Sequence, residues 1–179
     1  MRGPTWGETA GPRPCLTVLA RRREAEVRAA LAVDPASRRD ATFAEGEEAW
    51  TDDHTPVQIW TDGDRVIVVE PNGYLGSLPD VLRRMTGPGD GVAVFWNVNA
   101  EMKVVVVRAG AVVRELDPLL GDGEHDPLPE EAGLPFGDEQ PGAASLALLE
   151  RLTGFAATHE AILGPRRPTY TARTRALLG

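Results

Sequence analysis

Apolar runs separated by short polar turns predict a β-rich chain. Two of these turns, Asp62-Gly63 and Ala109-Gly110, each join a pair of apolar runs, and glycine takes the positive φ that a tight hairpin turn requires. The runs that we expect as strands are 15–20, 56–61, 65–70, 91–99, 102–108 and 111–116. The pattern therefore predicts a mainly antiparallel sheet of five or six strands that contains two hairpins.

Two of the expected strands carry information about the core. Residues 66–69 are apolar on both faces, which is typical of a central strand covered on both sides. In the run 91–99, alternation places Trp96 on the same face as Val92, Val94 and Val98. We therefore expect the strand 65–70 at the centre of the sheet and Trp96 in the core.

Helical spacing of apolar residues marks the segments between the strands. Asp40 and Thr158 are expected N-caps, Ser77 and Asp80 have the spacing of a capping box, and Gly154 is an expected helix stop. The expected helices cover 23–33, 40–50, a segment from the capping box to residue 87, 143–153 and a short turn after 158. The fold class that follows is α+β, with helices packed on at least one face of the sheet.

Length and composition indicate one domain with irregular flanks. The chain has 179 residues, of which 19 are glycine and 15 are proline. We expect a flexible N-terminal arm at 1–14, a single domain at 15–163 and a basic C-terminal tail at 164–179. Inside the domain, 117–142 is expected as an acidic loop rich in proline and glycine.

Charge is concentrated in two segments of opposite sign. Residues 117–140 contain eight acidic residues and no lysine or arginine, and 165–179 contain four arginines and no acidic residue. Segments of one charge that are rich in proline and glycine seldom order by themselves. We expect a mobile acidic loop that associates loosely with the basic tail, in a manner weakened by salt.

The overall charge excludes several classes of partner. A net charge of −8 and a pI near 4.9 argue against binding to nucleic acid or to an anionic membrane surface. Cys15 is the single cysteine and suits a reducing compartment, and the apolar runs are too short to cross a bilayer. We therefore expect a cytoplasmic protein with no nucleic-acid or membrane partner.

The sequence lacks the motifs of common catalytic and cofactor sites. His54 and His125 stand beside acidic residues, but no zinc-site spacing is present. An acidic run that begins at Asp122 departs from a calcium loop, since Pro127 and Gly133 stand where that loop needs glycine and glutamate. Neither G-x-S-x-G nor a glycine-rich phosphate loop occurs. We expect no metal, no cofactor and no assigned catalytic residue.

Polar residues stand at the carboxyl ends of two of the expected strands, 65–70 and 91–99. If those strands are parallel neighbours, their carboxyl ends form one edge that can bind a polar ligand, with Glu70 as a general base if burial raises its pKa. The candidate ligand-binding residues are Glu70, Asn72, Trp96, Asn97 and Asn99. The structural alternative is that Asn72-Gly73 forms a turn and the other asparagines satisfy backbone groups at a strand end.

Two segments resemble a known family. They are 68–77, with the sequence V-V-E-P-N-G-Y-L-G-S, and 92–100, with the sequence V-A-V-F-W-N-V-N-A. They are similar to a family of uncharacterised, mostly actinobacterial domains of unknown function, and the resemblance covers roughly residues 15–163. It implies a shared fold and a soluble actinobacterial protein, but it brings no established activity and no catalytic residues.

The function that we expect is therefore a non-enzymatic protein-interaction or regulatory module, of which an immunity-like protein is one form. Its acidic surface predicts a basic protein partner, attracted by charge. The alternative is a small-ligand-binding protein or a small enzyme that uses the edge around Glu70 and Asn97.

Overall fold

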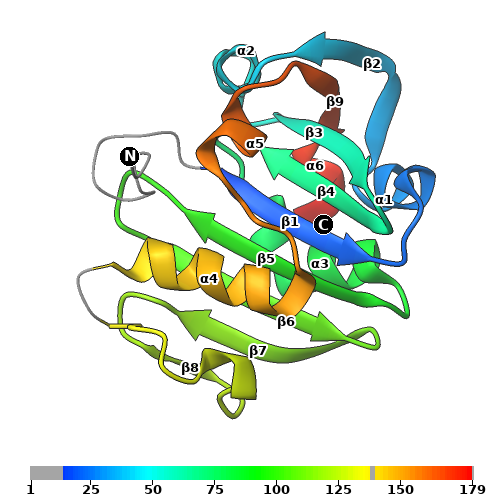
Figure 1. The fold of residues 1–179 in the computed structure, drawn as a ribbon. Helices are drawn as coiled ribbons and strands as arrows, with labels where there is room; N and C mark the ends of the chain where they lie inside the picture. The colour runs from blue at the N-terminus through cyan, green and yellow to red at the C-terminus, as the bar shows by residue number, and fades with distance from the viewer. Residues whose placement is uncertain (1–13, 138–139, 179) are drawn as a thin grey trace.

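The computed structural model describes residues 14–137 and 140–178 (Figure 1). Within them, nine strands form one sheet in the order β2-β9-β3-β4-β1-β5-β6-β7-β8, and every pair of neighbours is antiparallel. The strands are β1 (Cys15–Ala20), β2 (Val33–Ala41), β3 (His54–Asp62), β4 (Arg65–Glu70), β5 (Asp90–Trp96), β6 (Met102–Arg108), β7 (Ala111–Asp117), β8 (Asp122–Glu124) and β9 (Arg167–Arg173).

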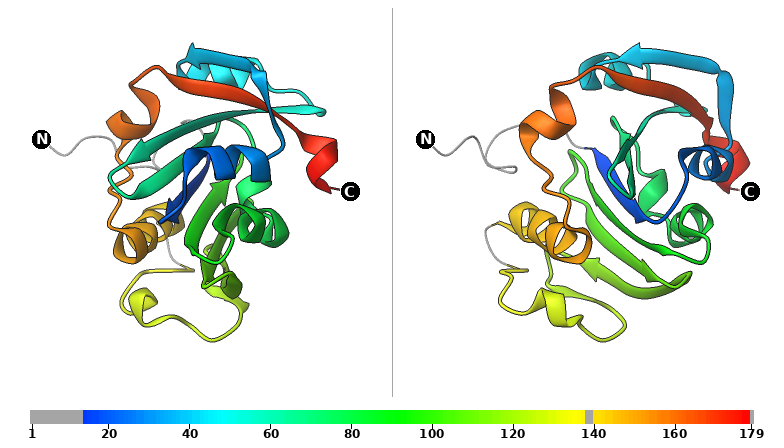
Figure 2. Two further views of the ribbon diagram at one scale, coloured as in Figure 1. Left: turned by 90° about the vertical axis from the view of Figure 1, so that its right-hand side faces the viewer. Right: turned by 45° about the vertical axis from the view of Figure 1, so that its right-hand side comes forward.

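Helices cover both faces of this sheet, and α4 and α3 lie on opposite faces (Figure 2). One hydrophobic cluster contains side chains of α1, α3 and α6, and the other contains side chains of α2, α4 and α5. The helices are α1 (Glu24–Ala30), α2 (Phe43–Glu48), α3 (Pro79–Thr86), α4 (Pro141–Thr153), α5 (His159–Leu163) and α6 (Thr174–Leu178), with short 3-10 turns η1 (Leu75–Ser77) and η2 (Pro129–Glu131). The α+β class is as predicted.

The sheet is larger than the five or six strands predicted. The predicted hairpins are confirmed as β3–β4 and β6–β7, and residues 66–69 of β4 are all buried, next to β1 in the middle of the sheet. The strands that the pattern missed are β2, β8 and β9. β2 contains Pro35 and exposed Arg38 and Arg39, and it pairs on one side only with an irregular register. A polar edge strand of this kind has no clear apolar alternation.

The C-terminal segment is part of the sheet. β9 lies between β2 and β3, and its Thr169, Tyr170 and Ala172 are buried. The prediction of a tail starting at 164 relied on its arginines, whereas the structure places the intervening small and aromatic side chains inside. Residues 1–13, which make up nearly all of the predicted N-terminal arm, lie outside the described residues.

Helix positions were predicted better than helix caps. α4 ends at Gly154, which has φ 69, and the Thr158 side chain accepts the Ala161 N–H at the start of α5, as expected. The capping box at Ser77 is wrong, because α3 begins at Pro79 and the Ser77 hydroxyl donates to the Tyr74 carbonyl. α2 is shorter than predicted and is capped by Thr42, because the unpredicted strand β2 occupies the preceding residues.

Trp96 differs from its predicted place in the core. It is the last residue of β5 and is half-buried, packed against the edge of the cluster that contains Val92 and Val94. The chain then turns away from the sheet, so that Val98 is 78% exposed, and its predicted place on the core face is wrong. Residues of one alternating run therefore have different environments, because the strand ends within it.

Candidate functional site

The condition for the predicted ligand edge is not met, because β4 and β5 are not neighbours. β1 lies between them and is antiparallel to both, with Cys15 opposite Glu70 on one side and opposite Phe95 on the other. β4 and β5 therefore run in the same direction but are one strand apart. The sequence could not show that the N-terminal strand is inserted at this position.

Glu70 is fully buried at the end of β4. Its carboxyl oxygens accept the backbone N–H groups of Leu75 and Gly76, each at 2.7 Å, and its own carbonyl accepts the Gly73 N–H at 3.2 Å. The segment 71–77 thus wraps around the Glu70 side chain. The motif E-P-N-G-Y-L-G-S is a closed loop held by its first residue.

The small and turn-forming residues of this motif fit that loop. Asn72 has φ 58, a backbone conformation that asparagine tolerates better than most residues. Gly76 has no room for a side chain, since a Cβ there would overlap Thr17 Oγ1 and lie 3.2 Å from the Cys15 sulfur. Close packing of backbone against β1 therefore explains the second glycine of the motif.

Burial controls the ionisation of the groups inside the loop. Desolvation raises the pKa of Glu70 to about 7, although hydrogen bonds from Gly76, Leu75 and Cys15 act in the opposite direction. Burial and the neighbouring carboxylate raise the pKa of the Cys15 thiol well above its ordinary value. Glu70 can hold a proton near neutral pH, but it has no exposed surface at which to meet a substrate.

The asparagines of the predicted edge serve or flank turns. Asn97 Oδ1 accepts the N–H groups of Asn99, at 2.9 Å, and of Glu101, at 3.0 Å, and the Asn97 amide donates to the Glu101 carboxylate. Asn72 and Asn99 are exposed. The structure brings these residues to one end of the sheet, but the hydrogen bonds of Glu70 and Asn97 go to their own loops. A ligand-binding role for this set stays a prediction.

The same end of the sheet carries a feature that the sequence analysis missed. Three aliphatic side chains are exposed at hairpin turns: Val98 at 78%, Leu119 at 38% and Leu120 at 74%. Val98 lies in the turn between β5 and β6, and the leucines lie in the turn between β7 and β8 (Figure 1). We call these three residues the hairpin-tip patch. Leu119 and Leu120 beside turn-forming residues were an available signal, whereas Val98 was expected on the core face of a strand.

Local hydrogen bonds fix the leucine turn. The Asp117 carboxylate accepts the N–H groups of Leu119, at 2.8 Å, and Leu120, at 3.3 Å. The Gly137 N–H donates to the Pro118 carbonyl at 2.9 Å, which ties the turn to the end of the acidic loop. The exposed leucines are therefore held by a defined turn.

Arginines of the sheet and of α4 hold the acidic loop. Arg114 is 3% exposed, and its guanidinium donates to both carboxyl oxygens of Glu131 at 2.8 and 3.1 Å and to the carbonyls of Glu124 and His125. Such a bidentate pair has a defined geometry. Further contacts come from Arg108 to the Glu130 carboxylate and from Arg151 to the carbonyls of Glu130 and Ala132.

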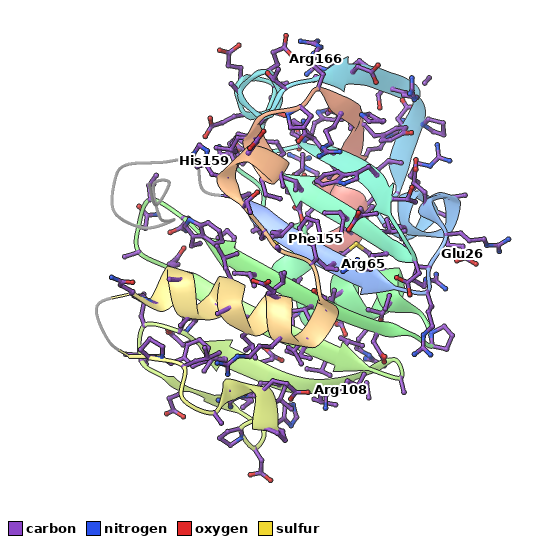
Figure 3. The ribbon with its side chains drawn as sticks, in the orientation of Figure 1. Glu26, Arg65, Arg108, Phe155, His159 and Arg166 are labelled. Carbon is purple, nitrogen blue, oxygen red and sulfur yellow. The ribbon has the colours of Figure 1, made fainter. Side chains whose placement is uncertain are left out.

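The predicted association of this loop with the C-terminal arginines is therefore wrong. Arg166 pairs with Glu45 and Arg175 pairs with Asp53. Figure 3 shows Arg166 and Arg108 at opposite ends of the molecule, with Arg108 beside the acidic loop. Two residues of the loop, Asp138 and Glu139, lie outside the described residues.

Part of the acidic loop carries exposed carboxylates close to the hairpin-tip patch in sequence. Asp122, Glu124 and Asp126 are exposed and begin two residues after Leu120. Within the described part of the chain, none of these three forms an ion pair, in contrast to Glu130 and Glu131. Exposed carboxylates that lack an ion-pair partner among the described residues therefore follow the leucine turn in the sequence.

Other candidate sites are less developed. A hollow of about 140 Å³ lies beside the end of α4, where Arg65 donates to the Thr153 carbonyl at 3.0 Å and pairs with Asp62. Across 14–137 and 140–178, no group of three or more metal-binding side chains is assembled. Over the same residues, no helix has the length and apolar character to cross a membrane.

Comparison with known proteins finds a family whose model matches the chain. The model of a family of unknown function, DUF6461, matches residues 10–166, and this range includes both motif segments and the hairpin-tip patch. No curated protein and no solved structure matches the chain. Because the family model covers most of the sequence, the chain belongs to DUF6461.

Proposed function

We propose that this protein is a binding module that uses the hairpin-tip patch to contact a partner protein. The observation that carries the proposal is the exposure of Val98 and Leu120, two aliphatic side chains that stand out from turns at one end of the sheet. Exposed aliphatic groups gain about 25 cal/mol for each Å² that a partner removes from water. Grouped apolar side chains with a polar rim are typical of interaction sites.

The charge around the patch favours a basic partner. Asp122, Glu124 and Asp126 stand next to the leucine turn, and the whole chain carries a formal charge of −8. Complementary charge accelerates encounter and aligns the partner, whereas buried apolar contact provides most of the lasting affinity. The partner that fits is a protein with an apolar centre and a basic rim.

Capture from cells of the source organism, followed by binding of the purified partner, tests the proposal. Wild type is compared with the double variant Val98→Asp, Leu120→Asp and with Leu178→Asp. Leu178 is a matched control, because it is 51% exposed on α6, away from the hairpin tips. We expect one protein to bind wild type and Leu178→Asp directly and to lose at least about tenfold in affinity for the double variant.

A charge variant separates the apolar and acidic contributions. Reversing Asp122 and Glu124 to lysine should slow association at low salt, whereas reversing Glu47 and Glu48, exposed on α2, should change it less. Equal binding by wild type and the double aspartate variant would show that the hairpin-tip patch is not the contact surface.

A further inference from the structure

A hollow of about 140 Å³ lies at the end of the sheet where β4 and β5 begin and β1 and β6 end, away from the hairpin-tip patch. These strands are consecutive in the sheet, in the order β4-β1-β5-β6. Their register places four lining residues in one row across the sheet: Arg65, Ala20, Asp90 and Arg108. Residues opposite one another on antiparallel strands share a face of the sheet, so the row brings two guanidinium groups and a carboxylate to one surface.

The floor of the hollow is apolar. Val18, Val92 and Val106 lie two residues further into the same strands, line the hollow and are at most 3% exposed. They belong to the hydrophobic cluster that packs under α4, and α4 ends at Thr153 beside the hollow. The charged row leaves room above these valines because one of its two inner members, Ala20, is small.

Two charged groups at the rim have unused hydrogen-bonding capacity. The Asp64 carboxylate is 80% exposed, and its ion pair with Arg65 is long, at 4.0 Å. Within the described part of the chain, Arg108 donates from Nη2 to the Glu130 carboxylate at 2.6 Å, and its Nε and Nη1 have no partner. Asp64 is next to β4 and Arg108 is on β6, so the two groups lie on opposite sides of the hollow.

The other guanidinium of the row, that of Arg65, is already occupied. It donates to the Thr153 carbonyl at the end of α4, at 3.0 Å, and pairs with Asp62 at 3.4 Å. The negative end of the α4 dipole thus helps to hold this guanidinium in place. Figure 3 shows Arg65 and Arg108 on the two sides of the C-terminal end of α4. Arg108 is therefore the guanidinium that is left for a ligand.

We propose that this hollow binds a small zwitterion, an aliphatic α-amino acid. Its carboxylate contacts Arg108, its ammonium group contacts Asp64, and its side chain packs on the three valines of the floor. The site is separate from the hairpin-tip patch and does not depend on the binding function proposed above.

The balance of charge around the hollow selects a zwitterion. Among the charged residues that line it, Asp64 and Asp90 are acidic, and Arg65 and Arg108 are basic. A simple anion would be repelled by two carboxylates, and a simple cation would be repelled by two guanidinium groups. A zwitterion gains an attraction at each end, and charge-assisted hydrogen bonds to both groups fix its orientation.

The dimensions of the hollow fit such a ligand. A cavity of about 150 Å³ holds a molecule the size of benzene. The isopropyl group of valine is smaller than benzene, so it fits the apolar part while the charged groups of the amino acid stay at the rim. The backbones of β4 and β6 are three strand spacings apart, about 14 Å, and side chains that extend from both sides shorten the span that the ligand bridges.

Titration of the purified protein with L-valine, followed by NMR of the backbone amides, tests the proposal. Two analogues isolate the charges, since isovalerate lacks the ammonium group and isobutylamine lacks the carboxylate. We expect valine to shift the amides of 18–20, 90–92 and 106–108 and to bind at least about tenfold more tightly than either analogue. Equal binding of valine and one analogue would show a simple ion site and would overturn the proposal.

Variants of the lining residues give an independent test by calorimetry. Arg108→Gln and Asp64→Asn should each weaken valine binding at least about tenfold. Ala20→Leu should have the same effect by filling the hollow, with a melting temperature near that of wild type. Arg83→Gln is the matched control, because Arg83 is an exposed, ion-paired arginine of α3, on the other face of the sheet, and this variant should bind valine as wild type does.

Unchanged valine binding in Arg108→Gln, Asp64→Asn and Ala20→Leu would show that the hollow is not the site. If these variants do not fold, the map of shifted amides in wild-type protein decides, because it needs no substitution. Shifts confined to another part of the sheet, or no shift of any amide at about 10 mM valine, would likewise contradict the proposal.

Discussion

Gly76 shows how closely a single residue of the motif is constrained. Its backbone packs on β1 so tightly that a methyl group would meet the Thr17 hydroxyl and the Cys15 sulfur, while its N–H holds the Glu70 carboxyl. Asn72 and Gly73 form the turn that brings this N–H into place. The hydrogen-bonding and packing groups of the motif thus contact the motif itself and β1.

At this position, Gly76→Ala should lower the free energy of unfolding by about 1–3 kcal/mol, because the added methyl group overpacks a rigid site. The double variant Thr17→Ala, Gly76→Ala removes the overlapping hydroxyl and should recover a large part of that loss. Urea denaturation of the two single variants and the double variant gives the coupling. Additive losses would show that the methyl group meets no obstacle at Thr17.

At the scale of elements, β7 and the acidic loop depend on one buried ion pair. Arg114 and Glu131 are 3% and 9% exposed, whereas the neighbouring pair of Arg108 and Glu130 is 43% and 31% exposed. Removing one member of a buried pair leaves an uncompensated charge, but exposed pairs contribute little. The first pair should therefore dominate the attachment of the loop.

Arg114→Met should cost about 3–5 kcal/mol of unfolding free energy and should speed hydrogen exchange across 122–132. Arg108→Met is the matched control and should cost less than about 1 kcal/mol. Denaturant titration and exchange mass spectrometry measure both effects. Equal, small losses in the two variants would mean that Arg114 does not fix the loop.

β9 is the second element whose role can be tested. Ala172 is 0% exposed inside the sheet, and its neighbour Arg173 is exposed on the other face. Ala172→Asp should therefore destabilise the protein by several kcal/mol or unfold it, because it buries an unpaired charge. Arg173→Asp should retain the wild-type circular dichroism and melting temperature within a few degrees. A mild effect of both variants would instead fit a mobile tail.

Local signals predicted only part of this architecture. Asp62-Gly63 and Gly110 marked the hairpins, because tight turns select glycine, and Gly154 and Thr158 marked helix boundaries. β9 escaped because its pairing partners, β2 and β3, are more than one hundred residues earlier in the chain. Strand order depends on such distant contacts, which periodicity does not encode.

The candidate site was predicted to a similar extent. The turn at Asn72 was the structural alternative to a ligand site, and burial of Glu70 was only a condition for its role as a base. The insertion of β1 between β4 and β5 could not be foreseen. Leu120 was visible in the sequence as an aliphatic residue among turn formers, whereas Val98 was predicted on the core face of the strand 91–99. Their exposure followed only from knowing where β5 and β7 end.

At the scale of the whole molecule, the hairpin tips and the motif loop lie at the same end of the sheet. One end combines the exposed aliphatic side chains of the hairpin-tip patch with exposed carboxylates, and the motif loop closes β4 at the same end. Arg166 and Arg175 pair with Glu45 and Asp53, outside the acidic loop. We therefore propose that the hairpin tips bind the partner and that the motif supports the fold from inside.

The most direct test replaces Val98, Leu120 or Leu178 with a photoreactive amino acid and cross-links the protein in cells of the source organism. A photoreactive side chain that a partner buries forms a covalent bond with that partner, whereas an exposed side chain outside the interface reacts with water. We predict the same cross-linked protein from positions 98 and 120 and none from position 178. Cross-links from 178 alone, or from none of the three positions, would contradict the proposed binding surface.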